Sequence, residues 1–426
     1  MQLIMKTHHF LLLLSLSALI SCTDDLGKTT VTYERANAIY GDLESFRNQQ
    51  LYTSPREIND PGKIFIGDRY LLIGEEGEGI HVFDNANPEN PTNLGFIQIF
   101  GNREFFLDGS DLYAEIVYDM VKIDLTSIQE PQLINRVTGV FAQPQFNDQG
   151  EAIIGFNYEE VTEEYDINDP DLEWLGVGGE TFFFDFNNRL IPRSAVPTSF
   201  AGNSSDGMGT VNRIASHEGF VYVISRTELS IFDAEGAFDL LAKRNIGWGM
   251  ETIYPLEDKL FIGSRNSMEV FNITNPTNPD RESSYFHENS CDPVLPVNTT
   301  TAYVTLRTGD FSECPGDTNE LLVLDVVSST GWNAMELQSF EMLSPYGMSL
   351  IGNRLYVGEG ANGLAVFDAS DNRNLQFIER DRTVEAYDII GHPSRADVIL
   401  IAGPTGFSQY RIGAAEEFLL ISNVAF

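Results

Sequence analysis

The chain has 426 residues, of which 63 are acidic and 26 are basic, and its formal net charge at pH 7 is −37. Such an acidic surface repels the phosphates of nucleic acids, so we expect no nucleic acid partner. The length is ample for a large core, and no apolar run after the first 21 residues is long enough to span a bilayer.

The chain opens with the three parts of a bacterial export signal. Lys6 supplies a positive charge, and residues 10–20 form an apolar stretch that is too short for a comfortable transmembrane helix. Leu19-Ile20-Ser21-Cys22 then resembles the lipobox of bacterial lipoproteins. We therefore predict a signal peptide over residues 1–21 and lasting membrane anchoring through several acyl chains on Cys22. The alternative is a plain secretory signal followed by an incidental cysteine.

Residues 22–54 are expected to form a tether. Thr23-Asp24-Asp25 resembles the acidic export tag of Bacteroidetes surface lipoproteins, which predicts a lipid-anchored protein on the outer face of the outer membrane. The alternative is an ordinary polar linker on a periplasm-facing anchor. Ile39, Leu43 and Phe46 share one face at helical spacing, which predicts a short helix over residues 36–47. Residues 29–33 could add an edge strand to the domain that follows, which leaves open how that domain closes.

From about residue 55 the sequence repeats itself at intervals of roughly 40 to 60 residues, the range of propeller blades. Each unit holds four short runs of β-branched and aromatic residues, divided by Gly, Asn, Asp and Pro. The third run of each unit ends in a recognisable way, at Asp84, Asp124, Asp185, Asp233, Asn272, Asp325, Asp368 and, in a degenerate copy, Tyr410. Eight units of four strands predict an all-β fold, an eight-bladed β-propeller over residues 55–426, with seven blades as the alternative.

The repeated aspartates are expected to be structural, because an Asp side chain caps the turn that follows it. No strand is left over once the eighth unit is complete. We therefore expect the ring to close by packing the first blade on the last, without a blade shared between the two ends of the chain.

The units resemble the LVIVD repeat of bacterial and archaeal surface proteins, in the form seen in Bacteroidetes lipoproteins. The stretches that carry this likeness are Asp60-Pro-Gly-Lys-Ile-Phe65, Gly79-Ile-His-Val-Phe-Asp-Asn85, Glu251-Thr-Ile-Tyr254, Cys291-Asp-Pro-Val294, Ala302-Tyr-Val-Thr-Leu-Arg307 and Ala386-Tyr-Asp-Ile389. The third unit departs from the pattern, with a long insertion and a run of three phenylalanines at 182–184. The resemblance implies a β-propeller on the cell surface and no established enzymatic activity.

Two cysteines remain besides Cys22. Thiols in an oxidising compartment most often pair, so we expect a disulfide between Cys291 and Cys314. The alternative is two buried free thiols.

One face of a propeller carries the loops between second and third strands and the connections between blades. Three of the longest excursions fall on these connections, at residues 157–179, 201–210 and 308–319. Long loops on a rigid scaffold are the usual place for binding. Trp174 in the first loop and Trp248 at a blade junction are therefore candidate ligand contacts. The alternative is decoration that only covers a hydrophobic rim.

Carboxylates recur near the starts of the innermost strands, at Glu104, Glu251, Asp292 and Asp388. If Glu251, Asp292 and Asp388 converge, they could bind a hard cation such as Ca²⁺. The alternative is that each carboxylate accepts hydrogen bonds from backbone amides near the axis. We expect no other cofactor. The loop at 166–171 resembles a Ca²⁺ loop only faintly, because it lacks the glycine and glutamate that such loops need.

Signals for catalysis are poor. The histidines outside the signal peptide are scattered over distant units without metal-ligand spacing, at 81, 217, 287 and 392. The chain also lacks a nucleophile elbow, a P-loop and a dinucleotide-binding glycine motif, so we assign no catalytic residue. We expect a monomeric, lipid-anchored surface propeller that binds a protein or a glycan without catalysis. The alternative is a lactonase-like propeller hydrolase with a metal in its central channel.

Overall fold

The computed structural model describes residues 28–141, 146–166, 168, 181–184, 190–192, 213–225, 227–287, 293–308, 318–327, 333–413 and 417–426. Their strands form eight sheets, which belong to two compact units. Unit one comprises Met1–Ile39 and Phe156–Pro197, and unit two comprises Tyr40–Gly155 and Thr198–Phe426. In the residues described, no helix has the length and apolar character that a membrane crossing requires.

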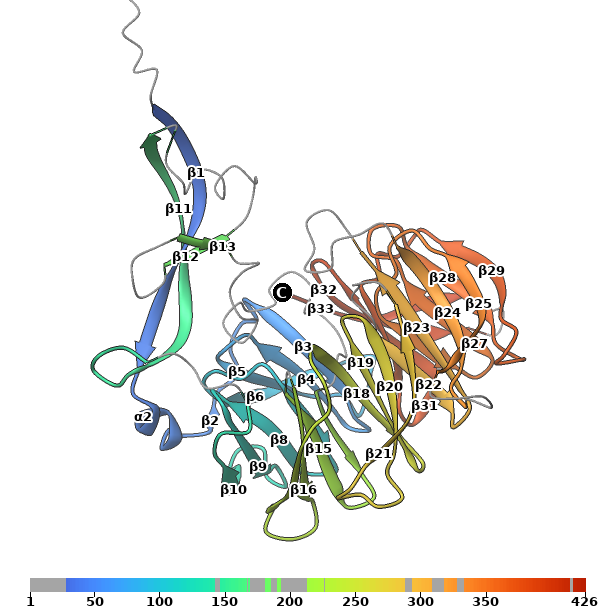
Figure 1. Ribbon diagram of the computed structural model, residues 1–426, viewed down its shortest axis with the longest axis horizontal. Helices are drawn as coiled ribbons and strands as arrows, with labels where there is room; N and C mark the ends of the chain where they lie inside the picture. Colours follow the sequence, from blue (N-terminus) through green and yellow to red (C-terminus); the bar gives the residue numbers. More distant parts are fainter. Residues whose placement is uncertain are drawn as a thin grey trace, which may run out of the picture. The chain divides into compact units, whose positions relative to one another are not determined.

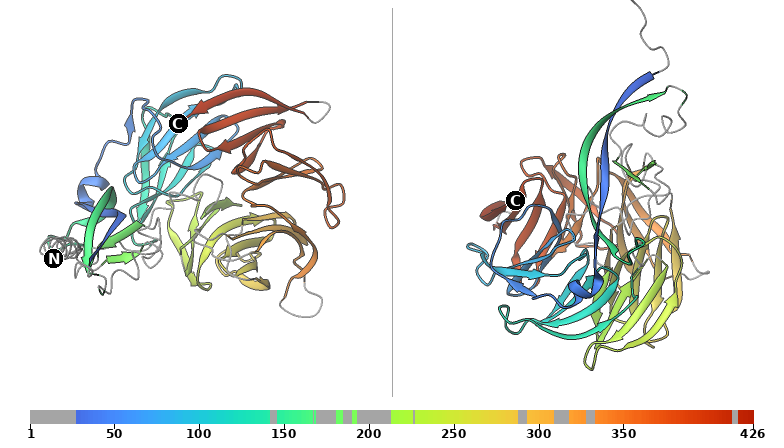
Figure 2. Two further views of the ribbon diagram at one scale, coloured as in Figure 1. Left: turned by 90° about the horizontal axis from the view of Figure 1, so that it is seen from above. Right: turned by 90° about the vertical axis from the view of Figure 1, so that its left-hand side faces the viewer.

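Unit two is a β-propeller of seven four-stranded antiparallel blades, which follow one another around a common axis (Figures 1 and 2). The first strand of each blade lies innermost and the fourth outermost. Blades one and two consist of β3 (Pro61–Ile66), β4 (Tyr70–Glu75), β5 (Gly79–Asp84), β6 (Thr92–Gln98), β7 (Phe105–Asp108), β8 (Asp111–Ile116), β9 (Asp119–Asp124) and β10 (Gln132–Val137).

The other five blades follow the same order of strands. Blades three and four are β14 (Ile214–His217), β15 (Phe220–Ile224), β16 (Glu228–Asp233), β17 (Leu240–Asn245), β18 (Met250–Leu256), β19 (Lys259–Ser264), β20 (Ser267–Asn272) and β21 (Asp280–Phe286). Blades five to seven are β22 (Val294–Asn298), β23 (Thr301–Arg307), β24 (Asn319–Asp325), β25 (Met335–Glu341), β26 (Met348–Ile351), β27 (Arg354–Gly358), β28 (Leu364–Asp368), β29 (Gln376–Asp381), β30 (Asp388–His392), β31 (Arg395–Gly403), β32 (Gly406–Ile412) and β33 (Phe418–Ala425).

The expected third blade is not a blade, so the prediction of eight was wrong by one and the alternative of seven is confirmed. In the described part of that segment there are three strands, β11 (Ala152–Asp166), β12 (Thr181–Phe184) and β13 (Leu190–Pro192). They form a separate sheet with β1 (Lys28–Gly41), in the order β11-β1-β12-β13. β1 pairs in parallel with β12, which a blade of consecutive antiparallel strands does not allow.

The boundaries at the start of the propeller also differ from those expected. β1 continues to Gly41, so the helix is restricted to α2 (Leu43–Arg47), where the Asp42 carboxylate caps the backbone N–H groups of Glu44 and Ser45. Strand pairing of the preceding residues overrides their helical spacing. The expected tether is therefore divided: β2 (Tyr52–Thr53) joins blade one as a fifth strand, outside β6.

The core lies between neighbouring blades, because both faces of each blade pack on another blade. The middle strands are accordingly buried along nearly their whole length, as in β4 and β5. Each outer strand carries a register shift against the third strand of its blade, as in β17 between the partners of Ile231 and Phe232. Such bulges increase the local twist of a sheet, which suits blades that must fan out from an axis.

The ring closes where blade seven packs on blade one. Leu400 and Phe407 of blade seven join a buried cluster with Ile64 and Phe83 of blade one, and the two phenylalanine ring centroids lie 6.4 Å apart. All four strands of blade seven are consecutive in the chain. Closure by packing, without a shared blade, is therefore what the structure shows.

Candidate functional site

The connection face of the propeller is the face where innermost strands begin and where each outer strand leads to the next blade. The sequence placed its candidate carboxylates there, and the structure puts three of them on three different blades. Glu104 precedes β7 of blade two, Glu251 lies in β18 of blade four, and Asp388 begins β30 of blade seven.

Glu251 and Asp388 already have partners within their own surroundings. The Glu251 carboxylate accepts a hydrogen bond from Arg265 Nε at 3.0 Å. The Asp388 carboxylate is buried, accepts the N–H of Ile389 at 2.8 Å and lies directly against Gly347. Within the described residues no group of three His, Cys, Asp or Glu side chains could hold a metal ion. The third member of the candidate calcium set, Asp292, lies outside the described residues, so that set remains a prediction.

Four further predicted residues also lie outside the described residues: Cys22, Trp174, Cys291 and Cys314. Lipidation and the disulfide therefore remain predictions. His81 and His217 have structural hydrogen-bond partners, His81 Nε2 with Glu75 Oε2 at 2.7 Å and His217 Nε2 with the Glu257 carbonyl oxygen at 2.7 Å.

Glu104 belongs to a cluster of charged side chains on blades one to three that the sequence reading largely missed. Lys63 Nζ of blade one donates to Glu104 Oε2 at 2.9 Å, and both side chains are buried. The same oxygen accepts the backbone N–H of Arg213, at the start of blade three, at 3.2 Å. Burial lowers the pKa of Lys63, and the neighbouring Glu104 opposes that shift.

A second ion pair lies beside the first. Arg103 Nε donates to Glu76 Oε1 at 3.1 Å. Burial raises the pKa of the Glu76 carboxyl above its usual range, the Arg103 guanidinium opposes that shift, and the negative charges of Asp60 and Glu104 add to it. Acids and bases are therefore concentrated in one place, at the junction between the first three blades.

Glu115 is the least expected member of this cluster. It lies in β8, its side chain is almost fully buried, and in the described part of the chain no hydrogen bond to its carboxyl is found. Burial raises the pKa of this carboxyl to about 8, while Arg103 and Arg213 oppose the shift and Glu104 and Glu76 support it. The sequence signal that could have revealed Glu115 is a glutamate inside the apolar run of a second strand. Only an alignment of the repeat units would have shown that this glutamate is unusual.

Aromatic side chains occupy other parts of the connection face. Tyr346 and Tyr387 meet edge to face with centroids 5.0 Å apart, and the Arg307 guanidinium lies 4.3 Å from the Tyr346 ring centroid. Trp248, which the sequence singled out, is 63% exposed in the connection to blade four. Phe286, which it did not, is 65% exposed at the end of β21 in the same blade.

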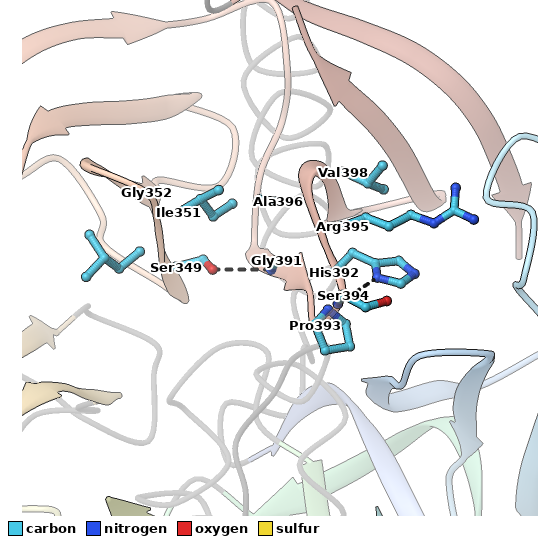
Figure 3. Close-up of a pocket in the computed structure, with 11 residues that line it drawn as sticks. Ser349, Ile351, Gly352, Gly391, His392, Pro393, Ser394, Arg395, Ala396 and Val398 are labelled. Carbon is cyan, nitrogen blue, oxygen red and sulfur yellow. Dashed lines mark hydrogen bonds between the residues drawn. The ribbon is translucent and has the colours of Figure 1, made fainter. Parts of the chain in front are cut away.

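A pocket of about 410 Å³ lies on the opposite face, between the ends of β26 and β30 (Figure 3). Ser349 Oγ accepts the N–H of Gly391 at 3.2 Å, and His392 Nδ1 accepts the N–H of Ser394 at 3.3 Å. Figure 3 shows the Ser349 and Ile351 side chains turned toward Gly391, whereas the imidazole extends away on the other side of the strand. The polar groups therefore do not converge on one point, and the pocket is a weaker candidate than the charged cluster.

Comparison with known proteins agrees with the architecture. The family model described as the LVIVD repeat matches residues 347–383, which span blade six. The chain is a repeat β-propeller, and its sixth blade is similar to the LVIVD repeat. Among solved structures, this propeller is similar to a protein from Lactobacillus plantarum at 11% identity and a TM-score of 0.53, covering 93% of this chain and 96% of the other.

It is also similar to a functionally unknown protein from Desulfotomaculum acetoxidans, at 10% identity and a TM-score of 0.50, covering 84% of this chain and 95% of the other. No curated protein matches the chain. At such low identities the likeness shows the fold alone.

Proposed function

We propose that this propeller is an exported, lipid-anchored surface protein that binds a protein or glycan partner through its connection face, without catalysing a reaction. One observation carries the proposal. Of the large hydrophobic side chains described, Phe286 and Trp248 are the most exposed, and both lie on the connection face of blade four.

Exposed aromatic side chains favour recognition for a physical reason. Leaving a Trp or Phe side chain in water forgoes the stabilisation that its burial would give. The same side chains bury a large apolar area on binding, with few rotatable bonds to freeze, and they are enriched at the energetic centres of protein interfaces. Sugar rings also stack on aromatic faces through their C–H groups. Trp248 and Phe286 are therefore suited to either class of partner.

A photo-crosslinking amino acid at position 248, in cells that make the full-length protein, tests the proposal for a protein partner. The matched control is position 420, since Leu420 is 59% exposed on the outer strand β33. We expect one adduct of defined mass from position 248 and none from position 420.

Binding of the purified propeller to a panel of bacterial and host polysaccharides tests for a glycan partner. We expect Trp248→Ala to weaken binding about tenfold, a typical loss for an anchoring aromatic residue, and Leu420→Ala to leave it unchanged. The proposed binding face is wrong if the crosslinker at position 248 gives no adduct and if Trp248→Ala and Phe286→Ala leave the binding of every polysaccharide unchanged.

The anchor needs its own experiment. Metabolic labelling with an alkyne fatty acid should label the wild-type protein, and Cys22→Ser should abolish the label. Protease added to intact cells should remove the propeller if it faces outward. Label retained in Cys22→Ser would contradict lipidation at that residue, and a protected propeller would contradict surface exposure.

A further inference from the structure

One backbone hydrogen bond recurs in several blades and identifies the position equivalent to Glu115 in each. The equivalent residues in those other blades are uncharged. The N–H of this second-strand residue donates to the carbonyl of the residue that starts the innermost strand: Glu115 to Glu104, Ile224 to Arg213, Thr305 to Pro293 and Gly358 to Gly347. Isoleucine, threonine and glycine satisfy the fold at the equivalent positions. The propeller therefore does not require an acid at Glu115.

The acid is also costly where it lies. Glu115 is 8% exposed, and its carboxyl has no hydrogen-bond partner among the described residues. Burying a carboxyl without a partner destabilises a fold, and such placements concentrate at functional sites. Because burial raises the pKa to about 8, the carboxyl is mostly protonated at neutral pH and can donate a hydrogen bond.

Arg213 complements this acid. Its backbone N–H is bound to Glu104, but its side-chain Nε is buried and lacks a hydrogen-bond partner. The other two cations of the cluster are already paired, Lys63 with Glu104 and Arg103 with Glu76. Arg213 is therefore the cation of this cluster whose side chain has no carboxylate partner among the described residues.

We propose that this junction binds the carboxylate group of an acidic ligand, with the Arg213 guanidinium as its ionic partner and the Glu115 carboxyl as a hydrogen-bond donor. A planar guanidinium matches a carboxylate with two parallel hydrogen bonds. A protonated acid offers one more donor, whereas an ionised Glu115 would repel the ligand. The inference deepens the proposed function and depends on it only in taking the connection face as the binding face.

Calorimetric titration of the purified protein at constant ionic strength tests the inference. D-glucuronate represents a sugar carboxylate and N-acetylglycine a peptide carboxylate, so the two probes distinguish the source of the ligand. Glucose and N-methylacetamide are their uncharged counterparts. We expect saturable millimolar binding of at least one carboxylate at pH 7 and none of either neutral compound.

Variants then assign the binding to these residues. Arg213→Gln should weaken binding at least tenfold, by analogy with the loss of a charge-assisted hydrogen-bond pair. Lys243→Gln is the matched control, because it removes a positive charge from the same blade at an outer-strand ion pair with Glu228. It should leave the affinity unchanged. Circular dichroism confirms folding, and Arg213→Lys, which keeps the charge but loses the fork, provides a milder second variant.

The pH dependence tests the role of Glu115. Between pH 7 and pH 9 the protonated fraction of a group with a pKa of about 8 falls about tenfold, so the wild-type affinity should fall about tenfold. Glu115→Gln carries a permanent N–H donor and should bind equally at both pH values. The charged groups that face Glu115 are Arg103, Arg213, Glu104 and Glu76; they are the same in the wild type and in Glu115→Gln, so the difference between the two proteins reports on Glu115.

Three results would overturn the inference: no saturable binding of either carboxylate, equal losses in Arg213→Gln and Lys243→Gln, or a wild-type affinity independent of pH. Any of these with intact crosslinking at position 248 leaves the proposed function standing. If a carboxylate binds but no partner is crosslinked at position 248, the inference stands and the proposed protein partner is contradicted.

Discussion

Close contacts of single residues hold the connection face in shape, and Gly347 against Asp388 is the tightest of those near the axis. A Cβ atom at position 347 would lie 1.7 Å from Asp388 Oδ1 and 3.2 Å from Asp388 Cα. The Asp388 side chain of blade seven therefore fills the space that Gly347 of blade six leaves open, because glycine has no side chain.

Gly347→Ala should accordingly destabilise the propeller, by about 1–3 kcal/mol, the usual cost of overpacking. Urea unfolding measures the change. Asp388→Ala removes the colliding carboxylate, so the double variant should lose less stability than the two single variants together. Strict additivity of the two losses would show that this contact does not cause the destabilisation.

Glu75 ties the start of blade one to its second strand. Its carboxylate accepts the N–H groups of Asn59 and Asp60, at 3.0 and 2.9 Å, and lies 2.7 Å from His81 Nε2. Burial alone would raise the pKa of Glu75, but the hydrogen bonds from His81, Asp60 and Asn59 outweigh it and hold the pKa below the usual range.

A carboxyl whose pKa is lower in the folded state than in the unfolded state stabilises the fold. This contribution is complete at pH values above the unfolded pKa and disappears as the pH falls through the folded pKa. We therefore expect Glu75→Gln to cost about 1–3 kcal/mol at pH 7 and progressively less as the pH falls below about 4. Urea unfolding at a series of pH values measures this difference, with Glu78→Gln, an exposed neighbour, as the control. A difference that stays constant down to pH 3 would contradict the assignment.

At the scale of elements, the pairing of β2 with β6 shows how an outer strand can be covered. Tyr52 OH donates to the Leu94 carbonyl at 3.2 Å, and the Tyr52 ring lies over Gly95, where a Cβ would approach within 2.3 Å. Among the strands that the structure describes, the outer strand is the last of its sheet in the other six blades.

Tyr52→Ala should release β2 while leaving the seven blades assembled. We expect faster hydrogen exchange at the backbone amide of Gln98, which donates to the Leu51 carbonyl next to β2 at 2.6 Å, and a loss of stability of about 1–2 kcal/mol. Tyr40→Ala, at a residue that is 39% exposed, is the control. Unchanged exchange in β6 would mean that β2 contributes nothing to the blade.

The sequence predicted the blades well, because the repeat, the strand period and the turn residues all point to the same unit. It failed where strand pairing is long-range. Residues 152–192 contain strands, and nothing local reveals that they pair with β1, far earlier in the chain, instead of forming a blade. The helical spacing of Ile39, Leu43 and Phe46 misled for the same reason, since β1 extends to Gly41.

The candidate site was predicted only in outline. Innermost-strand starts were the right places to look, and Glu104 is indeed part of a charged cluster. Its partners Lys63 and Arg213 come from blade one and from the start of blade three, so only the assembled ring brings them to Glu104. Trp248 could be identified because a tryptophan at a blade junction is conspicuous, whereas Phe286 resembles any other strand residue.

At the scale of the whole molecule, ring closure depends on one buried amide pair in addition to apolar packing. Asn85 Nδ2 donates to Gln409 Oε1 at 3.0 Å, and Gln409 Nε2 donates to Asn85 Oδ1 at 2.8 Å. Gln409 Nε2 also lies 3.1 Å from the Pro88 carbonyl and 3.1 Å from Ser422 Oγ. Both amides are fully buried between the first and last blades.

Gln409→Leu should therefore weaken the closure more than a surface change does, because it leaves the Asn85 amide buried without its partner, at a cost of about 1–3 kcal/mol. Thermal unfolding measures the global loss, and limited proteolysis in native buffer should first cut the chain in blade one or blade seven. The control is Gln376→Leu, on the exposed outer strand β29. Because the cost arises from the orphaned partner, the double change Asn85→Leu and Gln409→Leu should restore part of the stability. A Gln409→Leu protein as stable as wild type, or first cut in blades three to five, would show that apolar packing alone closes the ring.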